Sequence, residues 1–170
     1  MSLKLYDLSV NDLKNYIGLD SPPRFSWKIQ ASERGEGQLQ RRILVSQNRE
    51  ELEKAKGGQW DSGWVLSSDS LYIPYAGEKL EPLTRYYWRV FCIGQDGKEV
   101  RSEIAFFENA KLDTPWKAKW ITADFIDKAP KSAQKEQDAL AAPYLRKVFS
   151  IKKSVESARL VICGLGYFEA

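Results

Sequence analysis

Acidic side chains are the residues of this sequence that come nearest to a catalytic set. Two carboxylates that face each other across about 5 to 10 Å can cleave a glycosidic bond. The chain holds 23 Asp and Glu residues, but Asp61, Asp96 and Glu108 fall in predicted turns or on the predicted solvent-facing side of a strand. This pattern implies no concave acidic site, so we predict that the chain contains no catalytic residue. We expect Asp61 and Ser62 to bond to the backbone of a turn.

Metal and cofactor chemistry find no support in the sequence either. The chain has no histidine, which removes the commonest metal ligand and the usual general base near neutral pH. Cys92 and Cys163 lack metal-ligand spacing, and we predict that each is a small buried residue rather than half of a disulfide. The Gly164-Leu165-Gly166 motif is too short and wrongly placed for a phosphate-binding loop, so we interpret it as a turn or bulge. We expect no cofactor and no metal.

Aromatic residues raise a different hypothesis, because flat rings stack on the apolar faces of sugars. Of the six tryptophans, Trp27 and Trp88 are better explained as core residues of strands. Trp116 and Trp120 are better explained as packing that docks a linker between two domains. One cluster remains as a candidate carbohydrate contact, and it comprises Trp60, Trp64, Tyr72 and Tyr75.

Charge and hydropathy exclude several classes of partner. Lys and Arg number 26 against 23 Asp and Glu, and the net charge of +3 is spread thinly over the chain. No basic run favours a nucleic-acid or membrane surface. No window approaches the roughly 20 apolar residues of a membrane span, and the N-terminus lacks the apolar core of a signal peptide. The sequence leaves the cellular compartment open.

The stretch from residue 80 to residue 94 organises the predicted fold. Tyr86, Trp88, Val90 and Cys92 recur with the period of two that places side chains on one face of a strand. Tyr86 also stands where a tyrosine corner ties its hydroxyl back to nearby backbone in a β-sandwich. The Asp96-Gly97 pair predicts a tight turn, and residues 100–108 should return antiparallel beside the first strand.

Further strands are predicted at residues 4–10, 24–30, 38–46, 60–65 and 71–75. Phe25, Trp27 and Ile29 point inward in this prediction, while Ser26 points to solvent. Pro74 favours a strand end or an edge position, and Asn48 should cap a short helical turn that runs to Ala55. Residues 11–23 read as an irregular crossing. About seven short strands in 110 residues predict an all-β fold, an immunoglobulin-like or fibronectin-type-III-like sandwich.

The later residues predict the start of a second, jelly-roll-like β domain. We divide the chain into a sandwich at 1–110, a linker at 111–121 that carries Trp116 and Trp120, and an incomplete second β domain at 122–170. Within the last part, residues 122–143 read as a long loop with a short helix near 134–140. Residues 144–151 and 156–163 read as a pair of strands, and the apolar ending predicts that the chain is a fragment.

The ordered set of motifs in this chain resembles the N-terminal region of bacterial α-L-rhamnosidases, which are multidomain glycoside hydrolases. The resemblance covers nearly the whole chain. It rests on residues 17–27, Trp60-Asp61-Ser62-Gly63, Tyr72-Ile73-Pro74-Tyr75, residues 84–90, Asp96-Gly97-Lys98, residues 116–121, Leu145-Arg146-Lys147, and residues 158–167. Arg41 and Trp64 depart from the family pattern, which favours an aromatic residue at the first position and a polar residue at the second.

The resemblance implies a first β-sandwich followed by a second β domain, then an (α/α) barrel with the catalytic carboxylates, and a further β domain. The barrel would lie beyond residue 170. The resemblance therefore implies an accessory region that packs against the downstream catalytic domain of the same chain and positions its neighbours. Two alternatives are a receptor-type sandwich that binds a protein through a loop or edge strand and an independent carbohydrate-binding module. Self-association through exposed strands is also expected.

Overall fold

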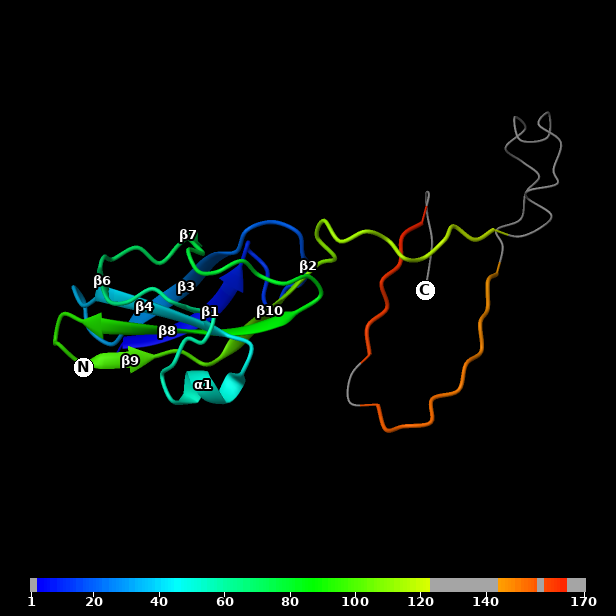
Figure 1. Cartoon of the computed structure of the whole chain (residues 1–170). Coiled ribbons are helices and arrows are strands. Elements are labelled where there is room, and N and C mark those ends of the chain that lie inside the picture. The colour runs from blue at the N-terminus through cyan, green and yellow to red at the C-terminus, as the bar shows by residue number, and fades with distance from the viewer. Residues whose placement is uncertain (1–2, 123–143, 156–157, 165–170) are drawn as a thin grey trace, which may run out of the picture. The chain divides into compact units, whose positions relative to one another are not determined.

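The computed structural model describes residues 3–122, 144–155 and 158–164. Its contacts divide the chain into two compact units, one ending at Thr114 and one beginning at Pro115. The first unit contains the regular elements (Figure 1). They are β1 (Leu3–Val10), β2 (Ile17–Leu19), β3 (Arg24–Ala31), β4 (Gln38–Ser46), α1 (Arg49–Glu53), β5 (Trp60–Asp61), β6 (Val65–Leu66), β7 (Ile73–Pro74), β8 (Arg85–Gly94), β9 (Glu99–Arg101) and β10 (Ala105–Asn109).

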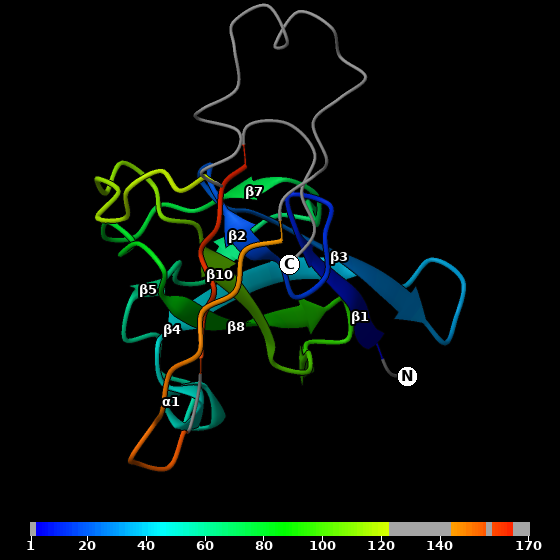
Figure 2. The same ribbon diagram turned by 90° about the vertical axis from the view of Figure 1, so that its right-hand side faces the viewer.

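The first unit is a two-sheet immunoglobulin-like sandwich, which confirms the predicted all-β fold. One sheet has the order β1-β3-β7, and the other has the order β2-β10-β8-β4-β5 with β6 on β4 and β9 on β8. Most neighbours are antiparallel, whereas β2 runs parallel to β10 (Figure 2). The prediction that Pro74 lies at an edge is confirmed, because β7 ends the three-stranded sheet. A proline at an edge costs no ladder hydrogen bond between strands.

Strand β8 is the centre of the larger sheet and begins at the predicted tyrosine corner. The backbone N–H of Glu81 donates to the Tyr86 hydroxyl over 2.8 Å. This bond fixes the chain that enters β8, five residues upstream of Tyr86. At the other end of β8, Gly97 takes a φ of 75° in the predicted turn, and its N–H donates to the carbonyl of Gly94 over 3.0 Å. Both predictions are confirmed.

Aromatic rings from both sheets fill the core. Phe25 of β3 contacts Trp88 of β8, with ring centroids 4.6 Å apart, and Phe107 of β10, with centroids 6.0 Å apart. Tyr86 stacks on Phe107. All four side chains are fully buried, so the period-two alternation identified the core correctly. Burial of such rings is the main favourable contribution to folding.

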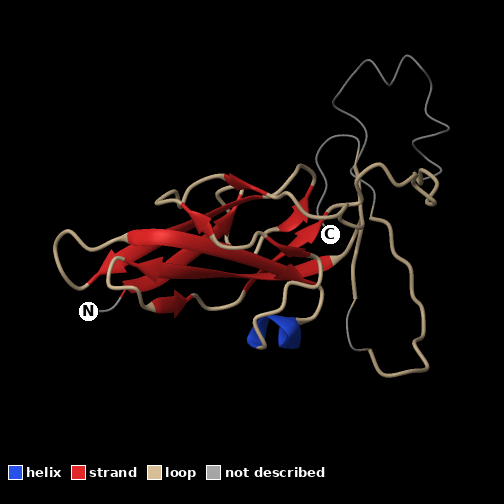
Figure 3. Ribbon diagram, turned by 60° about the vertical axis from the view of Figure 1, so that its left-hand side comes forward, coloured by secondary structure: helices blue, strands red, loops and turns tan. Residues whose placement is uncertain are grey.

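A smaller apolar cluster covers the outer face of the larger sheet. Leu44, Phe91 and Leu52 form it, and Leu52 is the buried residue of α1, the single blue helix in Figure 3. The Asn48 side chain accepts from the N–H of Glu50 over 2.9 Å, as predicted for an N-cap. The helix ends earlier than predicted, because Ala55 takes a φ of 54° and left-handed backbone terminates a helix.

Four predictions about single elements were wrong. The strand predicted at residues 60–65 is two short strands, β5 and β6, which both pair with β4 and are separated by residues 62–64. Residues 11–23 contain the short strand β2, whose middle residue, Gly18, has a φ of 88°. Ser26 is buried rather than exposed, because its hydroxyl accepts from the backbone N–H of Tyr72. The return strand is split into β9 and β10 at Ser102, whose hydroxyl accepts from the N–H of Val90 over 3.1 Å. Each difference arises from a contact between residues distant in the sequence.

The second unit carries no helix or strand within residues 115–122, 144–155 and 158–164. The predicted strand at 144–151 is therefore wrong, as is that at 156–163 over its described residues, and the predicted helix at 134–140 lies outside the described residues. Phe149 and Leu160 are exposed, and an isolated strand pair without a covering layer is marginal in water. The second β domain remains a prediction. No helix in the described part of the chain is long and apolar enough to cross a membrane.

Candidate functional site

Two of the four candidate carbohydrate contacts lie against the core. The Trp60 ring stacks on Phe25 with centroids 5.9 Å apart, and Tyr75 packs edge-on against Trp60 at 5.1 Å. Both side chains are half-buried. The Tyr75 hydroxyl donates to the carbonyl of Glu78, and burial raises the pKa of Tyr75 to about 12. The stacking on Phe25 turns one ring face of Trp60 toward protein, and Tyr75 packs against Trp60 and Phe25 in edge contacts.

The other two candidates are open to solvent. Trp64 is 38% exposed in the turn between β5 and β6, and Tyr72 is 51% exposed just before β7. Tyr72 also has a φ of 53°, a left-handed conformation that is rare for an aromatic residue. Contact of these residues with a sugar remains a proposal, and Tyr72 and Trp64 present the more accessible rings.

Tyr72 lines a surface hollow of about 270 Å³, which we call the Tyr72 hollow. The loop after β1, the loop between β2 and β3, and the first residue of β3 supply the rest of its wall. No local pattern predicts that these residues are neighbours, because Tyr72 lies about 50 to 60 residues further along the chain. The lining residues are Asn11, Asp12, Ser21, Pro22, Arg24 and Tyr72.

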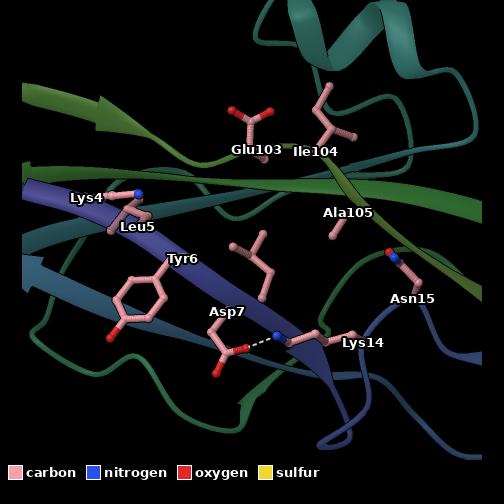
Figure 4. Close-up of a pocket in the computed structure, with 10 residues that line it drawn as sticks. Lys4, Leu5, Tyr6, Asp7, Lys14, Asn15, Glu103, Ile104 and Ala105 are labelled. Atoms are coloured by element: carbon pink, nitrogen blue, oxygen red, sulfur yellow. Dashed lines mark ion pairs between the residues drawn. The ribbon is translucent and has the colours of Figure 1, made fainter.

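A second hollow, of about 300 Å³, lies beside β1 and holds two carboxylates, Asp7 and Glu103 (Figure 4). The two carboxylates point away from each other in this view, unlike a glycosidase pair. Asp7 forms ion pairs with Lys14 and Lys28, and these two ammonium groups lower the pKa of Asp7 to about 2. A general acid needs a raised pKa, so Asp7 is unsuited to that role.

The predicted structural roles of the acidic residues are confirmed in part. The Asp61 carboxylate accepts from the N–H of Gly63 over 2.9 Å, as expected for a turn, and it also binds Arg42, whose guanidinium lowers the pKa of Asp61. Asp96 accepts from the N–H of Lys98 in its turn. Glu108 was wrongly predicted to face solvent. It is buried and forms an ion pair with Arg85 at 3.2 Å, which compensates the buried charge.

A buried polar cluster centred on Gln38 joins the two sheets. The Gln38 amide oxygen accepts from the Trp27 indole N–H over 3.1 Å and from the Cys92 thiol. Its amide nitrogen donates to the carbonyls of Ser67 and Asp69, both over 3.0 Å. The cluster is structural, because every donor and acceptor of the Gln38 amide has a partner inside the protein.

The cysteines differ from each other. Cys92 is buried, as predicted, and burial raises the pKa of its thiol to about 12. Cys163 is an exposed free thiol, so its predicted burial was wrong. The described residues 158–164 form no sheet that would cover it. Among the residues that the structure describes, no group of three His, Cys, Asp or Glu side chains is placed to hold a metal ion.

The two sheets, the tyrosine corner and the aromatic core define an immunoglobulin-like β-sandwich domain with shallow surface hollows. Residues 5–113 match the family model described as "Rha78A-like, N-terminal immunoglobulin domain". The chain therefore belongs to the family of N-terminal immunoglobulin-like domains of α-L-rhamnosidases.

Known relatives agree with this assignment. An α-L-rhamnosidase of Formosa agariphila is 34% identical over 99% of this chain, which spans 19% of that protein. The crystal structure of Streptomyces avermitilis α-L-rhamnosidase complexed with L-rhamnose matches 74% of this chain and 12% of that chain, with 34% identity and a TM-score of 0.68. The α-L-rhamnosidase structure from Dictyoglumus thermophilum matches 70% of this chain and 14% of that chain, with 36% identity and a TM-score of 0.66. The chain thus spans less than a fifth of the length of these relatives.

Proposed function

We propose that this chain is a non-catalytic accessory region of an α-L-rhamnosidase-like glycoside hydrolase, and that it packs against and positions the neighbouring domains. The observation that carries the proposal is the match of residues 5–113 to an N-terminal immunoglobulin domain of rhamnosidases, together with the match of nearly the whole chain to 19% of a much longer rhamnosidase. The orientation of Asp7 and Glu103 and the low pKa of Asp7 add support, because neither hollow presents a facing acid and nucleophile.

The chain leaves the sandwich just after β10, and the surface around that point is suited to such packing. The N–H of Ala110 donates to the carbonyl of Leu19 over 2.7 Å, and the N–H of Leu83 donates to the carbonyl of Ala110 over 3.0 Å. These bonds bring β2, the end of β10 and the start of β8 side by side. Ile17 and Leu83 are 58% and 45% exposed there. We call Ile17 and Leu83 the exit surface, and two large apolar side chains at the point of departure suit a domain contact.

An activity assay on two lengths of the protein tests the proposal. The 170-residue chain should hydrolyse no aryl α-L-rhamnoside, whereas a longer protein from the same reading frame should hydrolyse it. Turnover by the chain alone, in preparations freed of contaminating enzyme, would show that the catalytic groups lie within it. A reading frame that ends near residue 170 would also overturn the proposal.

A further inference from the structure

The Tyr72 hollow combines an exposed ring with charged and hydroxyl groups. The Tyr72 hydroxyl lies beside the Asp12 carboxylate, which raises the pKa of that phenol. Arg24 lines the same wall and carries an exposed side chain. Ser21 adds a hydroxyl group. An aromatic face bordered by a carboxylate, a guanidinium and a hydroxyl is therefore present on a surface that has no part in the sandwich core.

Hydrogen bonds hold both walls of the hollow in place. On one wall, the Asn11 amide donates to the Ser21 hydroxyl over 3.0 Å and accepts from the backbone N–H of Arg24 over 2.8 Å. On the other wall, the backbone N–H of Tyr72 donates to the buried Ser26 hydroxyl over 2.9 Å. Because the backbone of both walls is fixed before any ligand arrives, little ordering would accompany binding.

Left-handed backbone is concentrated at the same place. Asn11, Asp12 and Tyr72 have φ values of 46°, 69° and 53°. Three of the six lining residues therefore adopt a left-handed backbone conformation that residues other than glycine rarely adopt. Asn and Asp tolerate this conformation, but Tyr does not. The surrounding hydrogen bonds keep Tyr72 in this strained conformation, and such strain is typical of ligand sites.

The chemistry of the lining favours a neutral polyhydroxy ligand. Asp12 accepts hydrogen bonds and Arg24 donates them, and each sugar hydroxyl does both. The opposite charges of Asp12 and Arg24 balance, which disfavours an anion or a cation as the ligand. The Tyr72 ring offers an apolar face for the C–H surface of a pyranose. A volume of about 270 Å³ is near the lower limit of ligand pockets and suits one sugar ring.

We propose that the Tyr72 hollow is a binding site for a single neutral pyranose unit, in which Tyr72 stacks on the ring while Asp12 and Arg24 bond to neighbouring hydroxyls. The proposal is based on the lining residues, hydrogen bonds and volume of the Tyr72 hollow. Only the choice of L-rhamnose as the first probe follows from the family. Failure of this proposal would leave the packing role untouched, because packing is measured in a longer protein and sugar binding in this chain.

A two-dimensional ¹H–¹⁵N NMR titration of the 170-residue chain with L-rhamnose tests the site, with D-glucose and sodium phosphate as separate probes. The sugar should shift the amide signals of Asn11, Asp12, Ser21 and Arg24 and those of residues 70–73, with a millimolar dissociation constant; the prolines beside them give no amide signal. Tyr72→Asn keeps a residue that tolerates a positive φ and removes the ring, so it should weaken binding about tenfold or more. Tyr6→Asn is the matched control, since Tyr6 is 40% exposed in the hollow beside β1, and it should bind as the unmodified chain does.

Three results would overturn the proposal. The first is the absence of amide shifts with both sugars throughout the millimolar range. The second is an equal response from the unmodified chain and folded Tyr72→Asn. The third is a larger response to phosphate than to either sugar, because it would identify an anion site at Arg24. The amide spectrum of each variant reports its folding directly, so loss of structure is distinguished from loss of binding.

Discussion

The tyrosine corner allows a quantitative test of how the sandwich is held together. Tyr86→Phe removes only the hydroxyl that accepts from the N–H of Glu81 at 2.8 Å and from the Gln47 amide at 3.4 Å. The ring and its stacking on Phe107 stay in place. A partly buried N–H that loses its partner costs about 1 to 3 kcal/mol. We expect Tyr86→Phe to lower the free energy of unfolding by about 2 kcal/mol, which corresponds to a fall in Tm of roughly 8 °C.

The measurement is urea and thermal unfolding of the 170-residue chain followed by circular dichroism. Tyr75→Phe is the control, because it removes a hydroxyl whose bond to the Glu78 carbonyl lies at the surface. It should change stability by no more than about 0.5 kcal/mol. If Tyr86→Phe stays within that same margin, the corner does not brace β8 and our explanation of this motif is refuted.

Three further predictions concern charge, thiols and assembly. Asp7 has a lowered pKa of about 2, so its stabilising ion pairs are fully present above pH 3.8 and are lost as the pH falls through 2. The difference in Tm between the unmodified chain and Asp7→Asn should therefore shrink over that window, and a constant difference would contradict this. A thiol reagent at pH 8 should label Cys163 at once and Cys92 only after unfolding, whereas two rapid equivalents would show that Cys92 is accessible. Light scattering should detect self-association that increases with concentration and disappears when residues 115–170 are removed, because Phe149 and Leu160 are exposed. A strict monomer at high concentration would argue against it.

The parts of the fold that local pattern determines were predictable from sequence. In β3, Phe25 and Trp27 alternate with polar residues. In β8, Tyr86 and Trp88 alternate with residues that face the other side of the sheet. The period of two places both pairs in the core. The Asp96-Gly97 turn follows from local backbone chemistry. These features depend on neighbours within a few residues.

Other features depend on residues that the fold brings together from afar. The alternation in β3 predicts that Ser26 is exposed, but the backbone N–H of Tyr72 bonds to its hydroxyl and Ser26 is buried. Glu108 was also predicted to be exposed, but it is buried in an ion pair with Arg85. The Tyr72 hollow has the same origin. Tyr72 was predicted as a sugar contact, but its polar neighbours Asp12 and Arg24 come from other strands and loops, and no period in the sequence connects them.

Packing of the exit surface against a downstream domain is the central claim, and calorimetry of a longer protein from the same reading frame tests it most directly. Leu83 has a φ of 52°, a conformation that Asp tolerates better than Leu, so Leu83→Asp should not destabilise the 170-residue chain by itself. Leu66→Asp is the control. It replaces a leucine that is 74% exposed on β6, at the opposite end of the larger sheet.

We predict that Leu83→Asp separates the unfolding of the sandwich from that of the downstream domains in the longer protein, while Leu66→Asp leaves the unfolding profile unchanged. Identical profiles for Leu83→Asp and the unmodified longer protein would contradict the proposal that this surface packs against the rest of the longer protein.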